Sequence, residues 1–332
     1  MAVLPTYAEI GMTASCIMIL CRVIQGMTAM GECIGAQVYI TETVKPPMQY
    51  PMVTLVSVFA VTGGMVALAV GSFAANVISN WRFAFWLGLG VAIIGMVART
   101  TLRETPDFAD AKRSLEEFVK QTNRDPKLLT NSAIWQEKVN KLTAFSLFLI
   151  QCAYPLIFYF VYIHCGTIMR QQFGFTPEQI MNQNLIVILC ELASIIFLTY
   201  LSYKIYPLKI LKVLLIISTF LLCICPYLLN YINSPWQLLS IQISIILVST
   251  KSAPATPIFY KHFPVFRRFT MSCMMYALGR AVMFVITSYG LVFLIDIYGN
   301  WGLLILATPI LLGYKFALSH FEKLEQEQKV GT

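Results

Sequence analysis

The chain has 332 residues, of which 58% are hydrophobic and only 12% are charged, and its mean hydropathy is +0.70. Soluble globular domains are nearer half apolar and about a quarter charged, so this composition excludes a soluble protein and indicates one surrounded by the lipid bilayer. The net charge of +8 does not indicate a nucleic-acid partner, because the basic residues lie in loops between apolar runs.

Apolar runs of about 20 residues, the length that a helix needs to cross a bilayer, recur along the whole sequence. Turn-forming residues separate them, for example at 233–235 and at 299–300. We therefore predict an all-α polytopic membrane protein with nine transmembrane helices. These helices are expected at residues 13–39, 51–75, 82–102, 141–164, 179–201, 209–231, 236–259, 270–294 and 299–319.

One long polar segment marks the only expected domain boundary. It divides the chain into an incomplete N-terminal bundle of three helices (1–102), a central cytoplasmic loop (103–140) and a C-terminal six-helix bundle with a cytoplasmic tail (141–332). Of the 24 Lys and Arg residues, three lie inside the predicted spans, and among the other 21 only Arg82 and Arg170 fall on the side opposite that loop. Because basic loops stay in the cytoplasm, we predict an external N-terminus and a cytoplasmic C-terminus in the cell (inner) membrane.

Three polar residues share one face of the first predicted helix. At about 100° per residue, Arg22, Gln25 and Glu32 fall within a stripe about 80° wide. A charge that faces lipid at the bilayer centre costs about 2.5 kcal/mol or more, so the stripe must face protein or water. We interpret it as a cavity wall in which Glu32 exchanges a proton, Arg22 holds a solute carboxylate and Gln25 orients the solute. The alternative is that the two charges only pair with neighbouring helices, and that Arg22 extends towards the outer surface.

Further polar side chains fall inside the later spans. Glu191 is the only acid in its predicted helix, and it is either a second protonatable group in the cavity or a hydrogen-bond partner of a neighbouring helix. Tyr154 and Tyr159 either line the pathway or belong to the bundle core. Lys251 and Arg280 are intramembrane cations that either replace lost acidic partners or reflect drift.

Small residues on the first two spans favour close helix packing. Gly31 and Gly35 form a GxxxG pair, and Gly63, Ala67 and Gly71 form a similar row on the next helix. Such rows let helix backbones approach closely, so we predict packing at these positions rather than a binding site.

The sequence does not indicate an enzyme or a metal protein. His164, His262 and His320 lie far apart without ligand spacing, so we expect no metal site. Neither a phosphate-binding loop nor a nucleophile-elbow motif is present, so we expect neither an ATP-driven pump nor a hydrolase. We predict no cofactor, with the proton as coupling ion.

Several motifs connect the sequence to a known family. They are LPTYAEIG (Leu4–Gly11), CRVIQGMTAMGECIGA (Cys21–Ala36), WRFAFWLG (Trp81–Gly88), LRETPDF (Leu102–Phe108), FYKHFPVFRR (Phe259–Arg268) and MYALGRA (Met275–Ala281). This set resembles the metabolite:proton symporter branch of the major facilitator superfamily, the proline/betaine transporter-like carriers. The resemblance implies a bundle of six plus six helices, in which this chain corresponds to helices four to twelve.

The same resemblance implies secondary active transport, namely proton-coupled symport of a small zwitterion or organic acid by alternating access around a midplane cavity. The chain departs from the family at gating positions, with Tyr203 in place of Asp and Lys261 in place of Glu. Since three helices have no counterpart, we expect the lone chain to be incomplete or inactive and a separately encoded N-terminal three-helix fragment to be its partner. The alternative is a non-transporting membrane remnant or a membrane protein that binds a partner.

Overall fold

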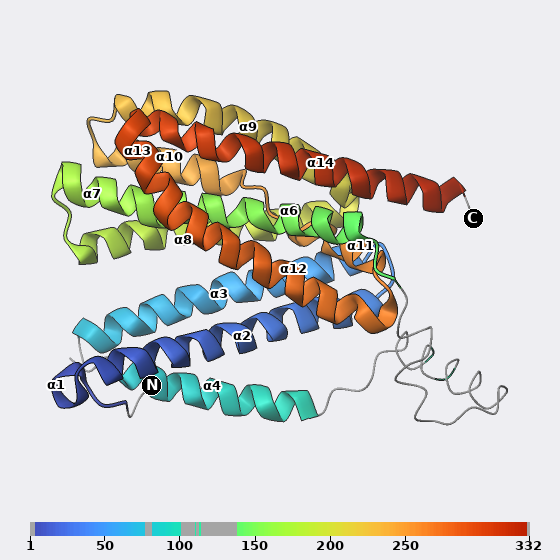
Figure 1. Ribbon diagram of the computed structural model, residues 1–332, viewed down its shortest axis with the longest axis horizontal. Coiled ribbons are helices and arrows are strands. Elements are labelled where there is room, and N and C mark those ends of the chain that lie inside the picture. The colour runs from blue at the N-terminus through green and yellow to red at the C-terminus, as the bar shows by residue number, and fades with distance from the viewer. Residues whose placement is uncertain (1–3, 77–81, 101–109, 111–112, 114–137, 331–332) are drawn as a thin grey trace.

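The computed structural model describes residues 4–76, 82–100, 110, 113 and 138–330, and these residues form helices without any strand (Figure 1). The N-terminal part holds α1 (Tyr7–Ile10), α2 (Met12–Thr43), α3 (Gln49–Asn76) and α4 (Arg82–Thr100). The C-terminal part holds α6 (Lys141–Phe158), η2 (Tyr159–His164), α7 (Cys165–Phe173), α8 (Pro177–Lys204), α9 (Pro207–Asn230), α10 (Pro235–Leu247), η3 (Ala253–Ala255), α11 (Thr256–Lys261), α12 (Val265–Val285), η4 (Ile286–Leu291), α13 (Val292–Tyr298), η5 (Gly299–Trp301) and α14 (Gly302–Val330). The predicted central loop lies almost wholly outside the described residues.

Six helical stretches of the described chain are long and apolar enough to cross a membrane, so the protein is a multi-pass membrane protein. One stretch, Val265–Lys329, contains the last two predicted spans, because α12, α13 and α14 follow one another through short helical segments. The predicted third and seventh spans overlap the shorter apolar helices Phe85–Val97 and Pro235–Leu247. The predicted all-α membrane fold is therefore confirmed.

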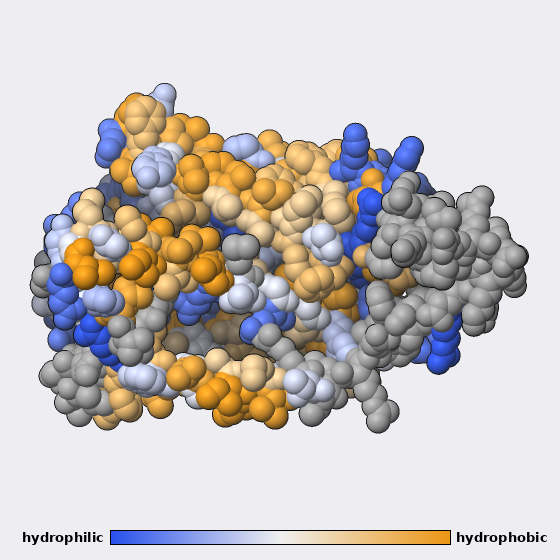
Figure 2. Space-filling model, turned by 60° about the horizontal axis from the view of Figure 1, so that its bottom comes forward, coloured by the Kyte–Doolittle hydropathy of each residue, from blue (hydrophilic) through white to orange (hydrophobic). Residues whose placement is uncertain are grey.

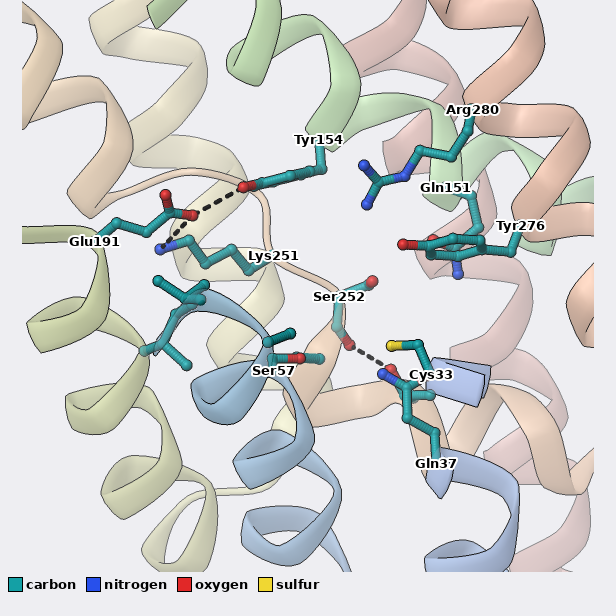
Figure 3. Close-up of a pocket in the computed structure, with 15 residues that line it drawn as sticks. Cys33, Gln37, Ser57, Gln151, Tyr154, Glu191, Lys251, Ser252, Tyr276 and Arg280 are labelled. Atoms are coloured by element: carbon teal, nitrogen blue, oxygen red, sulfur yellow. Dashed lines mark hydrogen bonds and ion pairs between the residues drawn. The ribbon is translucent and has the colours of Figure 1, made fainter. Parts of the chain in front are cut away.

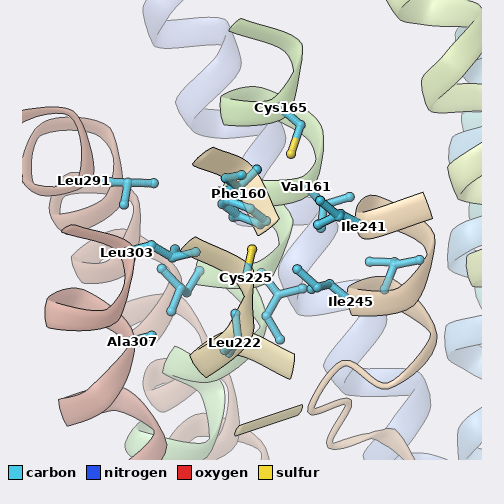
Figure 4. Packing of buried hydrophobic residues seen from close by; sticks show 14 of the residues in the cluster. Phe160, Val161, Cys165, Leu222, Cys225, Ile241, Ile245, Leu291, Leu303 and Ala307 are labelled. Atoms are coloured by element: carbon cyan, nitrogen blue, oxygen red, sulfur yellow. The ribbon is translucent and has the colours of Figure 1, made fainter. Parts of the chain in front are cut away.

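The helices are arranged in layers. α2, α3 and α4 lie along one side of the molecule, α9, α10 and α14 lie along the other, and α6, α8 and α12 lie between them (Figure 1). α3 packs against α8, and α2 packs against α12, so the N-terminal helices rest on the C-terminal bundle. α6 and η2 form the centre of that bundle, and their apolar side chains pack with those of α9, α10 and α14 (Figure 4).

Local sequence explains where several helices begin and end. Asn140 caps α6, because its side chain accepts a hydrogen bond from the N–H of Leu142 at 2.9 Å. Thr176 caps α8, and Pro177 occupies the first turn, where its missing N–H costs nothing. Gly174 ends α7 with a φ of +66°, a backbone conformation that favours glycine.

The predicted seventh span is wrong in one respect, because it is not a continuous helix. α10 ends before residues 248–252, which are irregular, and helix resumes only at η3. Pro254 and Pro257 lack the N–H groups that a continuous helix would use. The Ser249 hydroxyl donates to the carbonyl of Ile246 at 2.9 Å, a local bond that competes with the helical one. Such a break is tolerated at membrane depth only where it is buried in protein or lines a cavity.

The predicted cytoplasmic tail, residues 315–332, continues α14 as far as the structure describes it. Glu325, near the end of this helix, accepts a hydrogen bond from the Tyr206 hydroxyl at 2.6 Å. It also forms an ion pair with Lys261 and lies 3.0 Å from Nε2 of His262. Burial and the bond to Glu325 raise the pKa of Tyr206. These contacts dock the tail against the ends of α9 and α11.

The predicted small-residue packing is wrong at Gly31 and Gly63. A Cβ atom at either position would meet no other atom of the described chain within 4 Å, beyond its own helix. The close approach of two helices lies instead at Gly279 of α12, where a Cβ would be 3.0 Å from the Cβ of Gln151 in α6. The spacing of small residues shows that a face can pack closely, but it does not show whether a partner helix meets that face.

Candidate solute cavity

A cavity of about 170 Å³ lies between the N-terminal helices and the C-terminal bundle (Figure 3). α2 and α3 form one wall, α6, α8 and α12 form the others, and the irregular segment 248–252 enters from the end of α10. A space of this size admits water and small solutes. Its polar and charged lining is Cys33, Gln37, Ser57, Gln151, Tyr154, Glu191, Lys251, Ser252, Thr256, Tyr276 and Arg280.

Glu191 lies near the middle of α8 and is only 2% exposed. Tyr154 and Tyr162 donate hydrogen bonds to its two carboxylate oxygens, at 2.9 and 2.8 Å. The Nζ atom of Lys251 lies 3.7 Å from Oε1 of the same carboxylate. A buried carboxylate is costly unless it is hydrogen-bonded and paired, and these three groups supply both conditions.

Lys251 reaches this carboxylate from the break between α10 and η3, where the backbone is irregular. Its side chain is buried, with the Glu191 carboxylate as its ion-pair partner. A buried ion pair is stable only while both charges are present, because removal of one leaves the other uncompensated. Glu191 and Lys251 therefore stabilise each other inside the cavity.

Arg280 brings a second cation to the cavity from α12. Its guanidinium carbon lies 5.2 Å from the ring centre of Tyr154 and 4.8 Å from that of Tyr276, so both rings contribute cation–π attraction. Its Nε atom is buried without a hydrogen-bond partner, and it forms no ion pair with any carboxylate of the described residues. The close contact of Gly279 with Gln151 brings this part of α12 up to α6.

The α2 wall of the cavity is polar but uncharged. Cys33 and Gln37 lie four residues apart and so project from the same side of the helix. The Tyr260 hydroxyl, fully buried in α11, donates to Oε1 of Gln37 at 3.1 Å. Charge in the cavity therefore comes from the C-terminal bundle, and the N-terminal helices supply neutral hydrogen-bonding groups.

The polar stripe that was predicted on α2 does not line this cavity. Arg22, Gln25 and Glu32 are exposed and are not among the lining residues. The guanidinium of Arg22 lies 5.9 Å from the ring centre of Phe85 in α4, and its Nη1 is 3.5 Å from Oε1 of Gln25. Figure 2 shows a hollow with hydrophilic side chains on the face turned to the viewer, surrounded by hydrophobic surface. The role of the stripe as a cavity wall stays a prediction.

Two predicted site residues, Glu191 and Tyr154, do line the cavity, and they contact each other. Tyr159 does not line it and packs against the apolar core, as in the alternative given for it. Lys251 and Arg280 line the cavity, although the sequence assigned them no role. The available signal was their charge inside apolar runs, which by default marks a functional position.

A buried ion pair joins the two halves at the predicted cytoplasmic end. Nη1 of Arg268 in α12 lies 2.7 Å from Oε1 of Glu42 in α2, and the two side chains are only 8% and 6% exposed. Because each charge needs the other at this depth, the pair favours close contact of α2 and α12. The exposed pair of Lys212 and Glu322, by contrast, lies within the C-terminal bundle.

Comparison with known proteins gives a consistent result. A family model described as Major Facilitator Superfamily matches residues 2–287. The proline/betaine transporter of Salmonella typhimurium (strain LT2) is 27% identical over 121 residues, and that of Escherichia coli (strain K12) is 26% identical over 121 residues. The matched stretch covers 34% of this chain and 24% of each relative, about a quarter of the relatives' length.

Proposed function

The chain belongs to the Major Facilitator Superfamily, and from this premise we propose that it carries a small zwitterion or organic acid across the membrane together with protons. The solute would occupy the cavity between the two halves, which would rock against each other to expose it to either side in turn. The names of the relatives, proline/betaine transporters, support a small zwitterion as the solute.

The observation that carries this proposal is the environment of Glu191. A carboxylate buried at membrane depth, inside a cavity between two halves, is the kind of group that binds and releases a proton during transport. Its ionised form is held by Tyr154, Tyr162 and Lys251, and a proton would remove the charge on which the ion pair depends. The protonated and ionised cavities therefore differ in charge, which allows protonation to bias one conformation over the other.

The ion pair between Arg268 and Glu42 would act as the cytoplasmic latch in this scheme. It favours contact of α2 with α12, so the cytoplasmic side opens only when the pair separates. On opening, water must replace the partner that each charge has in the closed arrangement, so separation of α2 from α12 is coupled to hydration of both charges.

The polar face of α2 supports a further part of the proposal. Arg22, Gln25 and Glu32 are exposed, and charged side chains do not face hydrocarbon without large cost. We propose that additional membrane helices cover this face, and the expected three-helix fragment is the candidate. A photo-reactive residue in place of Gln25 tests this: adducts with a helical membrane polypeptide support the partner, and adducts with lipid alone contradict it.

The transport proposal is tested by uptake into vesicles under an imposed proton gradient, with proline and glycine betaine as solutes. Glu191→Gln should lower proton-driven accumulation by about 100-fold, because the coupling carboxylate is lost. Glu178→Gln is the matched control, since Glu178 is exposed in the first turn of the same helix. Full accumulation by Glu191→Gln would contradict the coupling role. Binding of solute without any uptake would favour the non-transporting alternative.

A further inference from the structure

We infer that Arg280 is a binding site for a carboxylate group, and that the solute enters the cavity with its carboxylate against this guanidinium. The inference rests on the proposed function, because it names the group of the solute that the cavity recognises. Carboxylate binding was predicted for Arg22, and no binding role was predicted for Arg280. The structure places Arg280 in the cavity and Arg22 outside it.

The charges of the cavity do not balance without an anion. Its charged lining residues are Glu191, Lys251 and Arg280. The first two form an ion pair with each other, which leaves Arg280 without a carboxylate partner among the residues that the structure describes. Arg280 is half-buried and its Nε atom is fully buried. A charge that is partly removed from water and has no partner is unfavourable, so a cavity built in this way favours the entry of one negative group.

The surroundings of Arg280 hold it ready for such a group. The rings of Tyr154 and Tyr276 attract the guanidinium and restrict its position without neutralising its charge. A guanidinium is a planar fork of donors that matches the two oxygens of a carboxylate. Its buried Nε atom has no hydrogen-bond partner among the described side chains, so donor capacity remains for a ligand. Figure 3 shows Arg280 on the same side of the cavity as Gln151 and Tyr276, whose polar groups can contact the rest of the solute.

One side chain connects this site with the proposed proton carrier. The hydroxyl of Tyr154 donates to Glu191, and the ring of the same residue lies against Arg280. A carboxylate bound at Arg280 adds negative charge beside Glu191, and like charges favour the protonated form of one of them. Binding of the anionic group and of the proton is therefore mutually favourable, which is the sign that symport requires.

The test is equilibrium binding to the purified full chain in detergent, without any transport step. The probes are radiolabelled proline and glycine betaine, with choline as the matched compound that keeps the quaternary ammonium and lacks the carboxylate. The wild-type chain should bind the first two and not choline. Arg280→Gln should weaken binding by about 30-fold or more, the usual effect of removing one partner from a buried charge pair. Arg280→Lys keeps the charge but not the fork, and it should lose less.

Control variants separate this result from misfolding. Arg170→Gln changes an exposed arginine in α7 outside the cavity and should bind within about twofold of wild type. Two further observations show whether a variant that loses binding is still folded. Arg280→Lys keeps a cation between the two rings, and a folded variant should elute as a single species.

Two results would overturn the inference. One is full affinity of Arg280→Gln for the carboxylate probes, above all if Arg22→Gln loses affinity instead. The other is equal binding of choline and glycine betaine. Either result would leave the transport proposal intact if Glu191→Gln still abolishes proton-driven uptake. Failure of the Arg280 inference can therefore be distinguished from failure of the transport proposal.

Discussion

Three polar groups converge on the buried carboxylate of Glu191, and they come from two separate parts of the C-terminal bundle. Tyr154 and Tyr162 lie on the first helix of the C-terminal bundle, and Lys251 lies in the irregular segment after α10. Each removes part of the cost of holding a charge at this depth. Loss of any one should therefore leave a buried acceptor or charge that the remaining groups do not fully satisfy.

Tyr162→Phe tests this at the level of one hydrogen bond. The variant keeps the ring and removes the hydroxyl that donates to Oε2 of Glu191 at 2.8 Å. We expect the free energy of unfolding in detergent micelles to fall by about 1–2 kcal/mol. Tyr289→Phe is the matched control, because Tyr289 is 76% exposed, and it should change stability by less than about 0.5 kcal/mol. Equal stability of the two variants would contradict the account.

The sequence predicted part of this site and missed part of it. Glu191 and Tyr154 were predicted, because an acid or a hydroxyl inside an apolar run stands out. Arg280 and Lys251 stood out equally, but spacing within one helix does not show which other helices converge on a residue. Arg22, Gln25 and Glu32 were predicted to share one face of a helix from their spacing. Whether that face is exposed depends on how the helices pack together, and spacing within one helix does not show this.

Among the secondary-structure elements, the apolar runs predicted the positions of the helices more accurately than the interruptions within them. Long runs of apolar residues need helices of membrane length, and helix is present in each predicted span. The break at 248–252 was missed, because this short polar run, Val-Ser-Thr-Lys-Ser, is flanked by apolar residues that together reach membrane length. Pro254 and Pro257 follow it. Proline is tolerated in many membrane helices, so the two prolines alone do not predict a break.

Gly279→Ala tests the close approach of α12 and α6. A Cβ at this position would lie 3.0 Å from the Cβ of Gln151, closer than normal contact. We expect α12 to be displaced and the free energy of unfolding to fall by about 1–3 kcal/mol. Because Arg280 is the next residue, binding of carboxylate probes should weaken as well.

Gly63→Ala is the control for this change. A Cβ at Gly63 meets no other part of the described chain within 4 Å, and alanine has the higher helix propensity. This variant should be neutral or slightly more stable in the same unfolding experiment. A Gly279→Ala chain that is as stable as Gly63→Ala would show that the two helices do not meet closely.

At the scale of the whole molecule, two halves enclose a charged cavity and are joined by a buried ion pair at one end. α2 and α3 contribute neutral groups to the cavity, whereas the C-terminal bundle contributes every charge in its lining. Movement of one half against the other would therefore expose these charges to water on one side at a time. In the proposed transport cycle, the pair of Arg268 and Glu42 would separate during one of these movements.

Glu42→Gln tests the latch through the natural thiol of Cys33, which lines the cavity. With the other cysteines replaced by serine, a charged thiol reagent added from the cytoplasmic side should label Cys33 about tenfold faster in this variant. The charge reversal of Glu42→Arg with Arg268→Glu should restore slow labelling. Glu322→Gln breaks an exposed pair and should change the rate by less than about twofold. Unchanged labelling in Glu42→Gln would show that the pair does not control access.

Solute-driven proton entry, measured in vesicles that contain the chain and a pH-sensitive dye, shows whether Glu191 couples solute movement to proton movement. No proton gradient is imposed, so any pH change is caused by the solute. We expect external proline or glycine betaine to acidify the interior with the wild-type chain and with Glu178→Gln, but not with Glu191→Gln. Acidification by Glu191→Gln at the wild-type rate, or solute entry into wild-type vesicles without any acidification, would contradict this coupling.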